Sequence, residues 1–163
     1  LSLHDALPIS LYKELAACHQ RERELEFALY EDSGIVLHGV IDSLGKNADG
    51  TWSIIDYKTG RAPAPDELPL GYVYQLAIYK KAAEKLFGYD IKECGLHYLQ
   101  NLSEFKMPQD KDYFHEAIAL CEKISQGADE TDFPCEAKYC SYCPYSYLCP
   151  GSAEADSEKN GHE

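Results

Sequence analysis

The sequence is poor in positive charge. Its 15 lysines and arginines stand against 28 aspartates and glutamates, which gives a formal net charge of −13 at pH 7. A protein that captures nucleic acid by itself normally presents a basic surface, so this balance argues against unaided capture of DNA or RNA. The chain also lacks the Gly-x-x-x-x-Gly-Lys-Ser/Thr loop that cradles nucleotide phosphates, which excludes an ATPase of that type within these residues.

Long apolar runs are absent as well, and no stretch approaches the roughly 20 residues that a membrane-spanning helix needs. No basic-then-apolar leader is found, so we expect a cytoplasmic protein without membrane contact. In that reducing compartment, clustered cysteines bind metal more often than they form disulfides. Four of the seven cysteines crowd the C-terminal part of the chain, at Cys135, Cys140, Cys143 and Cys149. Zinc held by four thiolates is the usual first interpretation of such a cluster.

The length of 163 residues fits one domain with a buried core. The chain does not begin with methionine, and residues 1–10 look like the translation of a sequencing adapter joined to a truncated gene; the alternative is a genuine helix-and-loop start. A helix is expected over residues 11–23. We expect the domain core in residues 11–132, without its upstream start, then a cysteine-cluster motif in residues 133–150 and a disordered acidic tail in residues 151–163.

Two runs rich in apolar and β-branched residues, 35–44 and 51–55, predict neighbouring strands. The Asp-Gly pair between them favours an antiparallel hairpin with Asp42 opposite Asp56. Alternation predicts that one face of the second strand carries Trp52, Ile54, Asp56 and Lys58, and that one face of the first carries Val36, His38, Val40, Asp42 and Leu44. Two carboxylates that meet in this way can share a divalent ion, and oxygen ligands suit Mg²⁺ or Mn²⁺.

The clearest predicted helix covers residues 71–88, where apolar residues recur at helical spacing and a glycine supplies the stop. Gln75 and Tyr79 are four residues apart and therefore share one face near its start. Residues 94–99 predict another strand, and residues 113–126 predict a second helix.

Each of these polar residues also has a plainer interpretation. Asp42 can cap the end of a strand, Asp56 and Lys58 can lie on a solvated face, and Tyr79 can belong to the core. These interpretations do not explain why three polar groups converge on two otherwise apolar strands.

Three motifs in order, Gly-x-Ile-Asp at 39–42, Ile-Asp-Tyr-Lys-Thr-Gly at 55–60 and Gln-x-x-x-Tyr at 75–79, resemble the RecB-like branch of the PD-(D/E)XK nucleases. The resemblance implies an α/β fold: a restriction-endonuclease-like core, with a central mixed β-sheet flanked by helices, and a C-terminal cysteine-cluster extension. It also implies a role for each matching residue: metal-binding carboxylates for Asp42 and Asp56, a main-chain metal ligand for Tyr57, the catalytic lysine for Lys58, and the adjacent helix motif for Gln75 and Tyr79.

The same resemblance changes the interpretation of the cysteines. Cys140, Cys143 and Cys149 match the C-terminal cysteines of family members that hold a 4Fe-4S cluster, in which a fourth cysteine comes from upstream. Cys135 is a possible substitute for that ligand. Zinc remains the alternative, because thiolates bind both.

The implied activity is Mg²⁺- or Mn²⁺-dependent hydrolysis of DNA, more plausibly by an exonuclease than by an endonuclease. We expect the C-terminal nuclease domain of a helicase–nuclease subunit in double-strand break repair and recombination, poorly active by itself. Its partners would be DNA and a helicase, in the same chain or in another subunit. One alternative is a free-standing CRISPR-associated RecB-like nuclease. Another is a non-catalytic iron–sulfur or zinc module that binds DNA on an inactive nuclease-like scaffold.

Overall fold

The structure, a computed structural model, describes residues 20–64 and 68–127. The chain divides into two compact units, Leu1–Glu122 and Lys123–Glu163, and the fold described below belongs to the first, apart from the last residues of its final helix. Of the second unit only residues 123–127 are described. The predictions for residues 1–10, the acidic tail and the cysteine cluster of Cys135, Cys140, Cys143 and Cys149 therefore lie outside the described residues.

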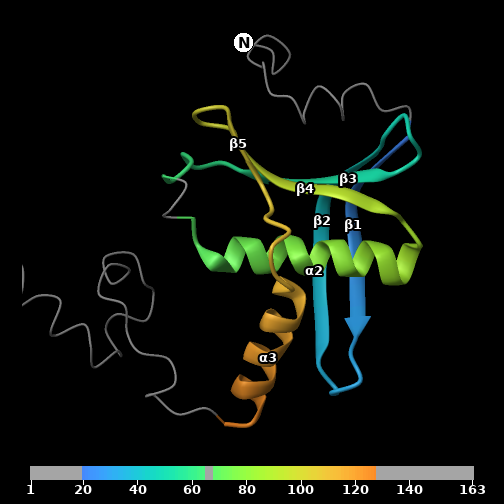
Figure 1. The fold of residues 1–163 in the computed structure, drawn as a ribbon, viewed down its shortest axis with the longest axis vertical. Helices are drawn as coiled ribbons and strands as arrows, with labels where there is room; N and C mark the ends of the chain where they lie inside the picture. Colours follow the sequence, from blue (N-terminus) through green and yellow to red (C-terminus); the bar gives the residue numbers. More distant parts are fainter. Residues whose placement is uncertain (1–19, 65–67, 128–163) are drawn as a thin grey trace, which may run out of the picture. The chain divides into compact units, whose positions relative to one another are not determined.

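The described elements form a mixed sheet of five strands with helices beside it (Figure 1). In chain order they are β1 (Arg21–Tyr30), β2 (Val36–Lys46), β3 (Trp52–Lys58), α2 (Leu70–Phe87), β4 (Ile91–Tyr98), β5 (Ser103–Lys106) and α3 (Tyr113–Ser125). The strands follow the same order across the sheet. All neighbours are antiparallel except β3 and β4, which are parallel and are joined by α2. This is the α/β architecture with a central mixed sheet that the family resemblance implies.

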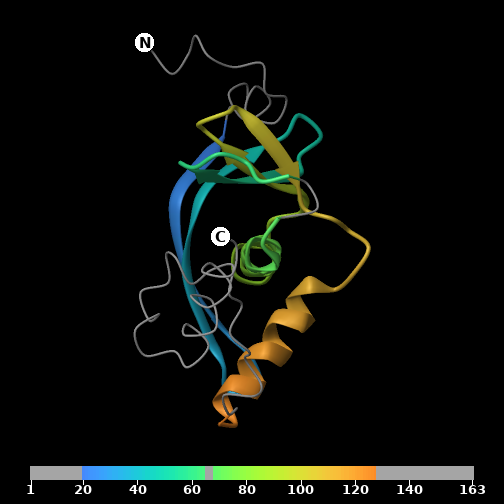
Figure 2. The same cartoon turned by 90° about the vertical axis from the view of Figure 1, so that its left-hand side faces the viewer.

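Helix α2 lies against one face of the sheet, and Figure 2 shows it nearly end-on, on the concave side of the curved strands β1 and β2. Apolar side chains from the helix and from all the longer strands meet in this layer, including Phe27, Leu29, Ile41, Leu44, Ile54, Val73, Leu76, Ala83 and Leu96. The helix ends at Gly88, whose φ of 69° is left-handed and is readily adopted by glycine. No helix among the described residues is long and apolar enough to cross a membrane.

The predicted hairpin is confirmed in its register. Ser43 pairs with Ile55 and Leu44 with Ile54, and the same register, extended by one position, sets Asp42 opposite Asp56. The helix predicted over residues 71–88 and the strand predicted over residues 94–99 are also found, with ends shifted by a few residues.

The predicted helix over residues 11–23 is wrong at its C-terminal end, because Arg21 to Arg23 already belong to strand β1. That strand alternates charged residues with Leu25, Phe27 and Leu29, which is the period of a strand with one buried face. Glu24 and Glu26 lie on the other alternating set and are exposed, which suits an edge strand, and Arg21 and Arg23 are exposed at the start of the strand.

Simple alternation predicts that every second side chain of β2 is equally exposed along the strand, and the structure differs. Val36, His38 and Val40 are exposed, whereas Leu44 on the same alternating set is fully buried. The change occurs around Asp42, where the pairing of β1 with β2 is interrupted and the opposing Glu24 has a left-handed φ of 50°. Residues 36–40 of β2 are largely exposed, whereas Asp42 is held toward β3 by its hydrogen bond to the Tyr57 N–H.

Candidate active site

Asp56 and Lys58 stand at the end of β3, two positions apart and therefore on the same face. The first five residues of β3 are all buried, because the strand lies in the middle of the sheet. Asp56 is only 3% exposed, and its Oδ2 lies 2.7 Å from Lys58 Nζ. A carboxylate in so buried a position needs a cationic partner, and Lys58 supplies it.

Asp42 reaches the same end of β3 from strand β2. Its Oδ2 accepts a hydrogen bond of 2.9 Å from the main-chain N–H of Tyr57. This contact fixes the Asp42 carboxylate beside the residue that lies between Asp56 and Lys58. The predicted meeting of the two aspartates at adjacent strands is therefore present in the structure.

Helix α2 completes the arrangement from above the sheet. Lys58 Nζ donates a hydrogen bond of 2.8 Å to Gln75 Oε1, and Gln75 Nε2 donates one of 2.9 Å to the hydroxyl of Tyr79. Asp56, Lys58, Gln75 and Tyr79 thus form one connected chain of polar contacts. Tyr79 is also buried in the core, so it contributes both to packing and to this polar network.

Tyr72 is a neighbour of this network that the sequence interpretation did not assign to the site. Its ring lies under Lys58 Nζ, 4.4 Å from the ring centre, in a cation–π contact. Tyr72 lies three positions before Gln75 and seven before Tyr79, so all three share one face of α2. This helical spacing is the sequence pattern from which Tyr72 could have been assigned to the site.

Gly39, the first residue of the Gly-x-Ile-Asp motif, has a packing role beneath the site. A Cβ at this position would lie 2.9 Å from Phe27 Cζ and 3.7 Å from Tyr79 Cε1. The Phe27 and Tyr79 rings meet edge to face, with centroids 5.9 Å apart. Glycine therefore leaves the room that lets Phe27 support the Tyr79 ring, and with it the polar end of α2.

Burial and charge act against each other at Asp56. Burial raises the pKa of Asp56 above its ordinary value, the contact with the Lys58 ammonium lowers it, and the charge of Asp42 raises it again. Burial likewise raises the pKa of Tyr79, and the charges of Asp56 and Asp42 add to that effect. The two carboxylates are thus close enough to sense each other in a water-poor setting, where an added cation is strongly favoured.

The donor set at this point suits a hard divalent ion. Within residues 20–64 and 68–127, no group of three or more histidine, cysteine, aspartate or glutamate side chains could enclose a metal. Asp42 and Asp56 are two carboxylates, and Tyr57, which directly follows Asp56 and bonds to Asp42 through its N–H, offers a main-chain carbonyl beside them. Mg²⁺ is commonly held by one or two carboxylates, with water filling its other positions, so this smaller set fits Mg²⁺ or Mn²⁺.

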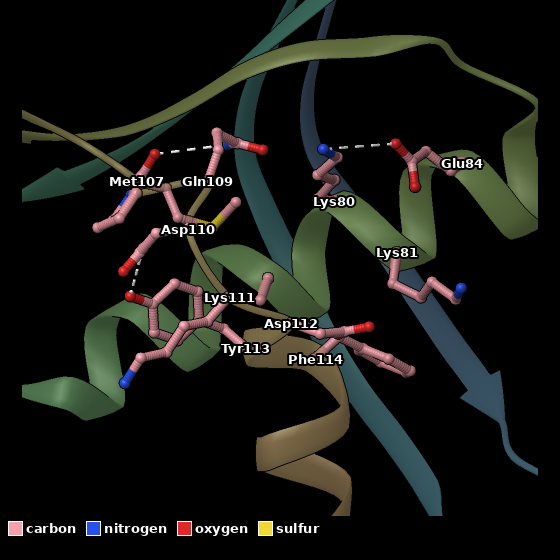
Figure 3. A pocket seen from close by; sticks show the side chains of 12 residues that line it. Lys80, Lys81, Glu84, Met107, Gln109, Asp110, Lys111, Asp112, Tyr113 and Phe114 are labelled. Atoms are coloured by element: carbon pink, nitrogen blue, oxygen red, sulfur yellow. Dashed lines mark hydrogen bonds and ion pairs between the residues drawn. The ribbon is translucent and has the colours of Figure 1, made fainter.

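A separate groove of about 480 Å³ lies between α2 and the segment that leads into α3 (Figure 3). Its lining includes Lys80, Lys81 and Lys111, together with acidic residues, and none of the six predicted nuclease-site residues. The acidic residues already have partners: Asp110 accepts a hydrogen bond from the Tyr113 hydroxyl, and Glu84 lies 4.0 Å from Lys80. The groove is therefore distinct from the polar network around Lys58.

Comparison with known proteins gives several matches. The chain is 34% identical over 102 residues to an ATP-dependent helicase/nuclease subunit of Pelotomaculum thermopropionicum, a match that covers 53% of this chain and 8% of that protein. It is 38% identical over 73 residues to the protein of the same name from Moorella thermoacetica, covering 45% of this chain and 5% of that one. The chain thus spans less than a tenth of the length of these relatives.

A solved structure titled "Crystal structure of SSO0001" superposes with a TM-score of 0.59, at 23% identity, covering 86% of this chain and 66% of that one. That likeness supports the fold. The family model of the PD-(D/E)XK nuclease superfamily matches residues 3–150, which is nearly the whole chain. The chain therefore belongs to the PD-(D/E)XK nuclease superfamily.

Proposed function

We propose that this chain is a nuclease domain that hydrolyses phosphodiester bonds of DNA with the help of Mg²⁺ or Mn²⁺. The observation that carries the proposal is the contact between buried Asp56 and Lys58, with Asp42 fixed beside them by the Tyr57 N–H. Asp42, Asp56 and the carbonyl of Tyr57 would hold the ion. When bound, such an ion lowers the pKa of a coordinated water and neutralises charge on the attacked phosphate.

The protein residues supply orientation and charge. Lys58 is held from three sides, by Asp56, by Gln75 and by the ring of Tyr72. An ammonium fixed in this way can orient the attacking water or stabilise negative charge that develops on the phosphate. Gln75, itself bonded to Tyr79, keeps the ammonium aimed at the site. The network is therefore organised before substrate arrives.

We further propose that the domain acts as an exonuclease within a helicase–nuclease, in the processing of double-strand breaks. The net charge of −13 is unfavourable for capturing DNA from solution. A helicase in the same polypeptide or in a partner protein would deliver a strand at high local concentration and remove this handicap. The names of the relatives from Pelotomaculum and Moorella, which couple a helicase with a nuclease, support this proposal.

The direct test is DNA degradation by the wild-type chain. We expect cutting with Mg²⁺ or Mn²⁺ and none after EDTA is added, because the two carboxylates and the lysine do not suffice without the ion. The measurement is a single-turnover assay on a short labelled oligonucleotide, with protein in large excess so that weak DNA affinity does not limit cutting. Degradation that continues undiminished in EDTA would contradict a metal-dependent mechanism.

We also propose that the C-terminal cysteines bind a 4Fe-4S cluster. The ligands would be Cys140, Cys143 and Cys149, with an upstream cysteine or Cys135 as the fourth. These residues lie outside the described part of the chain, and the proposal is supported by the spacing of the cysteines in the sequence after the nuclease core. Protein purified without oxygen should be brown and contain iron and sulfide in equal amounts, and replacement of Cys143 by Ser should remove the colour. Colourless wild-type protein with one zinc per chain would contradict this proposal and favour the zinc alternative.

A further inference from the structure

Tyr98 is the last residue of β4 and lies beside the proposed active site. It pairs with Lys58 across the parallel β3–β4 ladder, so the two side chains emerge on the same face of the sheet. Asp56 lies two residues earlier on β3, on that same face. Tyr98 is 3% exposed and belongs to the core beneath α2. The ring is thus fixed by packing, with its polar end near the Asp56–Lys58 pair.

The hydroxyl of Tyr98 is buried and has no hydrogen-bond partner among the described residues. Asp56 Oδ2 is likewise buried, and Lys58 Nζ lies 2.7 Å from it. A carboxylate oxygen can accept more than one hydrogen bond, so it retains capacity beside Lys58. A buried polar group without a partner lowers stability, which makes such a group a sign of function when it lies at a site.

Electrostatics place the hydroxyl near the same charges. Burial raises the pKa of Tyr98, and the neighbouring Tyr72 and Asp56 raise it further. The hydroxyl therefore stays protonated at neutral pH and is a donor. A phosphate oxygen would be repelled by the Asp56 carboxylate, whereas a water molecule can accept from Tyr98 and donate to Asp56 at once.

We propose that Tyr98 is a positioning residue of the site, whose hydroxyl donates to a water molecule that in turn donates to Asp56 Oδ2. This inference rests on the proposed nuclease function and adds a residue from β4 to a site otherwise formed by β2, β3 and α2. A water held from two sides keeps a defined position and orientation relative to Lys58.

The test is Tyr98→Phe, which removes one oxygen and keeps the ring. We expect the maximal single-turnover rate of DNA cutting to fall about tenfold to a hundredfold, as misplacement of a reacting group does. The protein concentration at half-maximal rate should not change, because the hydroxyl does not contact the phosphate. The Tm of the metal-free protein should change by no more than a few degrees, because the ring and its packing are kept. Tyr30→Phe, at a tyrosine that is 69% exposed, is the matched control.

Each outcome has a distinct meaning. Wild-type cutting by Tyr98→Phe would overturn the role of Tyr98 and leave the nuclease proposal standing. A higher protein concentration at half-maximal rate, with an unchanged maximal rate, would assign the hydroxyl to phosphate binding and overturn the water contact. A loss of cutting accompanied by a Tm lowered by many degrees would assign the hydroxyl a purely structural role and overturn the proposal. Wild-type protein that never cuts DNA would instead refute the proposed function.

Discussion

Asp56→Asn is expected to reduce metal-dependent DNA cutting by about a thousandfold or more, because the amide cannot replace a charged ligand of the ion that activates water. The affinity for Mn²⁺ without DNA should fall in parallel, which isothermal titration calorimetry can measure. The fold should survive, since asparagine has the same shape as aspartate and Asp56 stands near the end of β3. Asp32→Asn, at an exposed turn residue, is the matched control.

The stability of the same variant provides a second measurement. Burial raises the pKa of Asp56 in the folded protein from its ordinary value of 3.8. A raised pKa means that the protonated form favours folding, and that this contribution is lost as pH rises through the folded pKa. The metal-free Asp56→Asn protein should therefore have a Tm equal to or above that of wild type at neutral pH. The difference should shrink on acidification, as wild-type Asp56 becomes protonated. Cutting at the wild-type rate by Asp56→Asn would contradict the assignment of this residue as a metal ligand.

Lys58→Met should reduce cutting by about a hundredfold to a thousandfold, the usual cost of removing one group that stabilises charge in a transition state. Methionine keeps most of the apolar stem that packs near Tyr72 and removes the ammonium. The affinity for Mn²⁺ without DNA should rise, because the ammonium now lies 2.7 Å from Asp56 Oδ2 and competes with any cation for that oxygen. The two substitutions thus share a loss of cutting and differ in the direction of the change in metal affinity.

The Lys58→Met protein should be less stable than wild type in the absence of metal. Asp56 would be left as a buried charge without its cationic partner, and we expect the free energy of unfolding to fall by about 1–3 kcal/mol. Added Mn²⁺ should restore the Tm, since a bound cation replaces the lost charge. Lys92→Met is the control, because Lys92 is mostly exposed and pairs with Asp49 at a distance of 2.8 Å. Reduced Mn²⁺ affinity in Lys58→Met would show that the lysine does not compete for the carboxylate.

Much of the site could be predicted from sequence because its parts are local. An Asp-Gly turn between two apolar strands predicts the hairpin register, and in that register, which Ser43 and Ile55 confirm, Asp42 lies beside the end of β3. Helical periodicity then locates Gln75 and Tyr79 on one face of α2. The remaining step, which places this helix face above the end of β3, came from the family resemblance and agrees with the contact between Lys58 and Gln75.

Other features depend on three-dimensional context that no local pattern contains. The exposed half of β1 is highly charged, and charged residues occur equally well in helices, which explains the mistaken helix end at Arg23. The change of exposure along β2 occurs where its pairing with β1 is interrupted, at Asp42 and Glu24. Tyr98 looks like any core aromatic until the parallel pairing of β3 and β4 brings it next to Lys58. The need for glycine at position 39 becomes clear only from the Phe27 and Tyr79 rings packed against it.

Helix α2 has a second consequence that concerns how such a domain can be rearranged in evolution. Parallel neighbours such as β3 and β4 need a crossover connection, and α2 is that connection. All the predicted nuclease residues therefore lie in one continuous stretch, from Asp42 to Tyr79. Insertions at the exposed turn around Gly34, or in the connection after β4, leave this stretch intact. A unit organised in this way can be joined to very different polypeptides and still carry its reactive groups as a single inherited block.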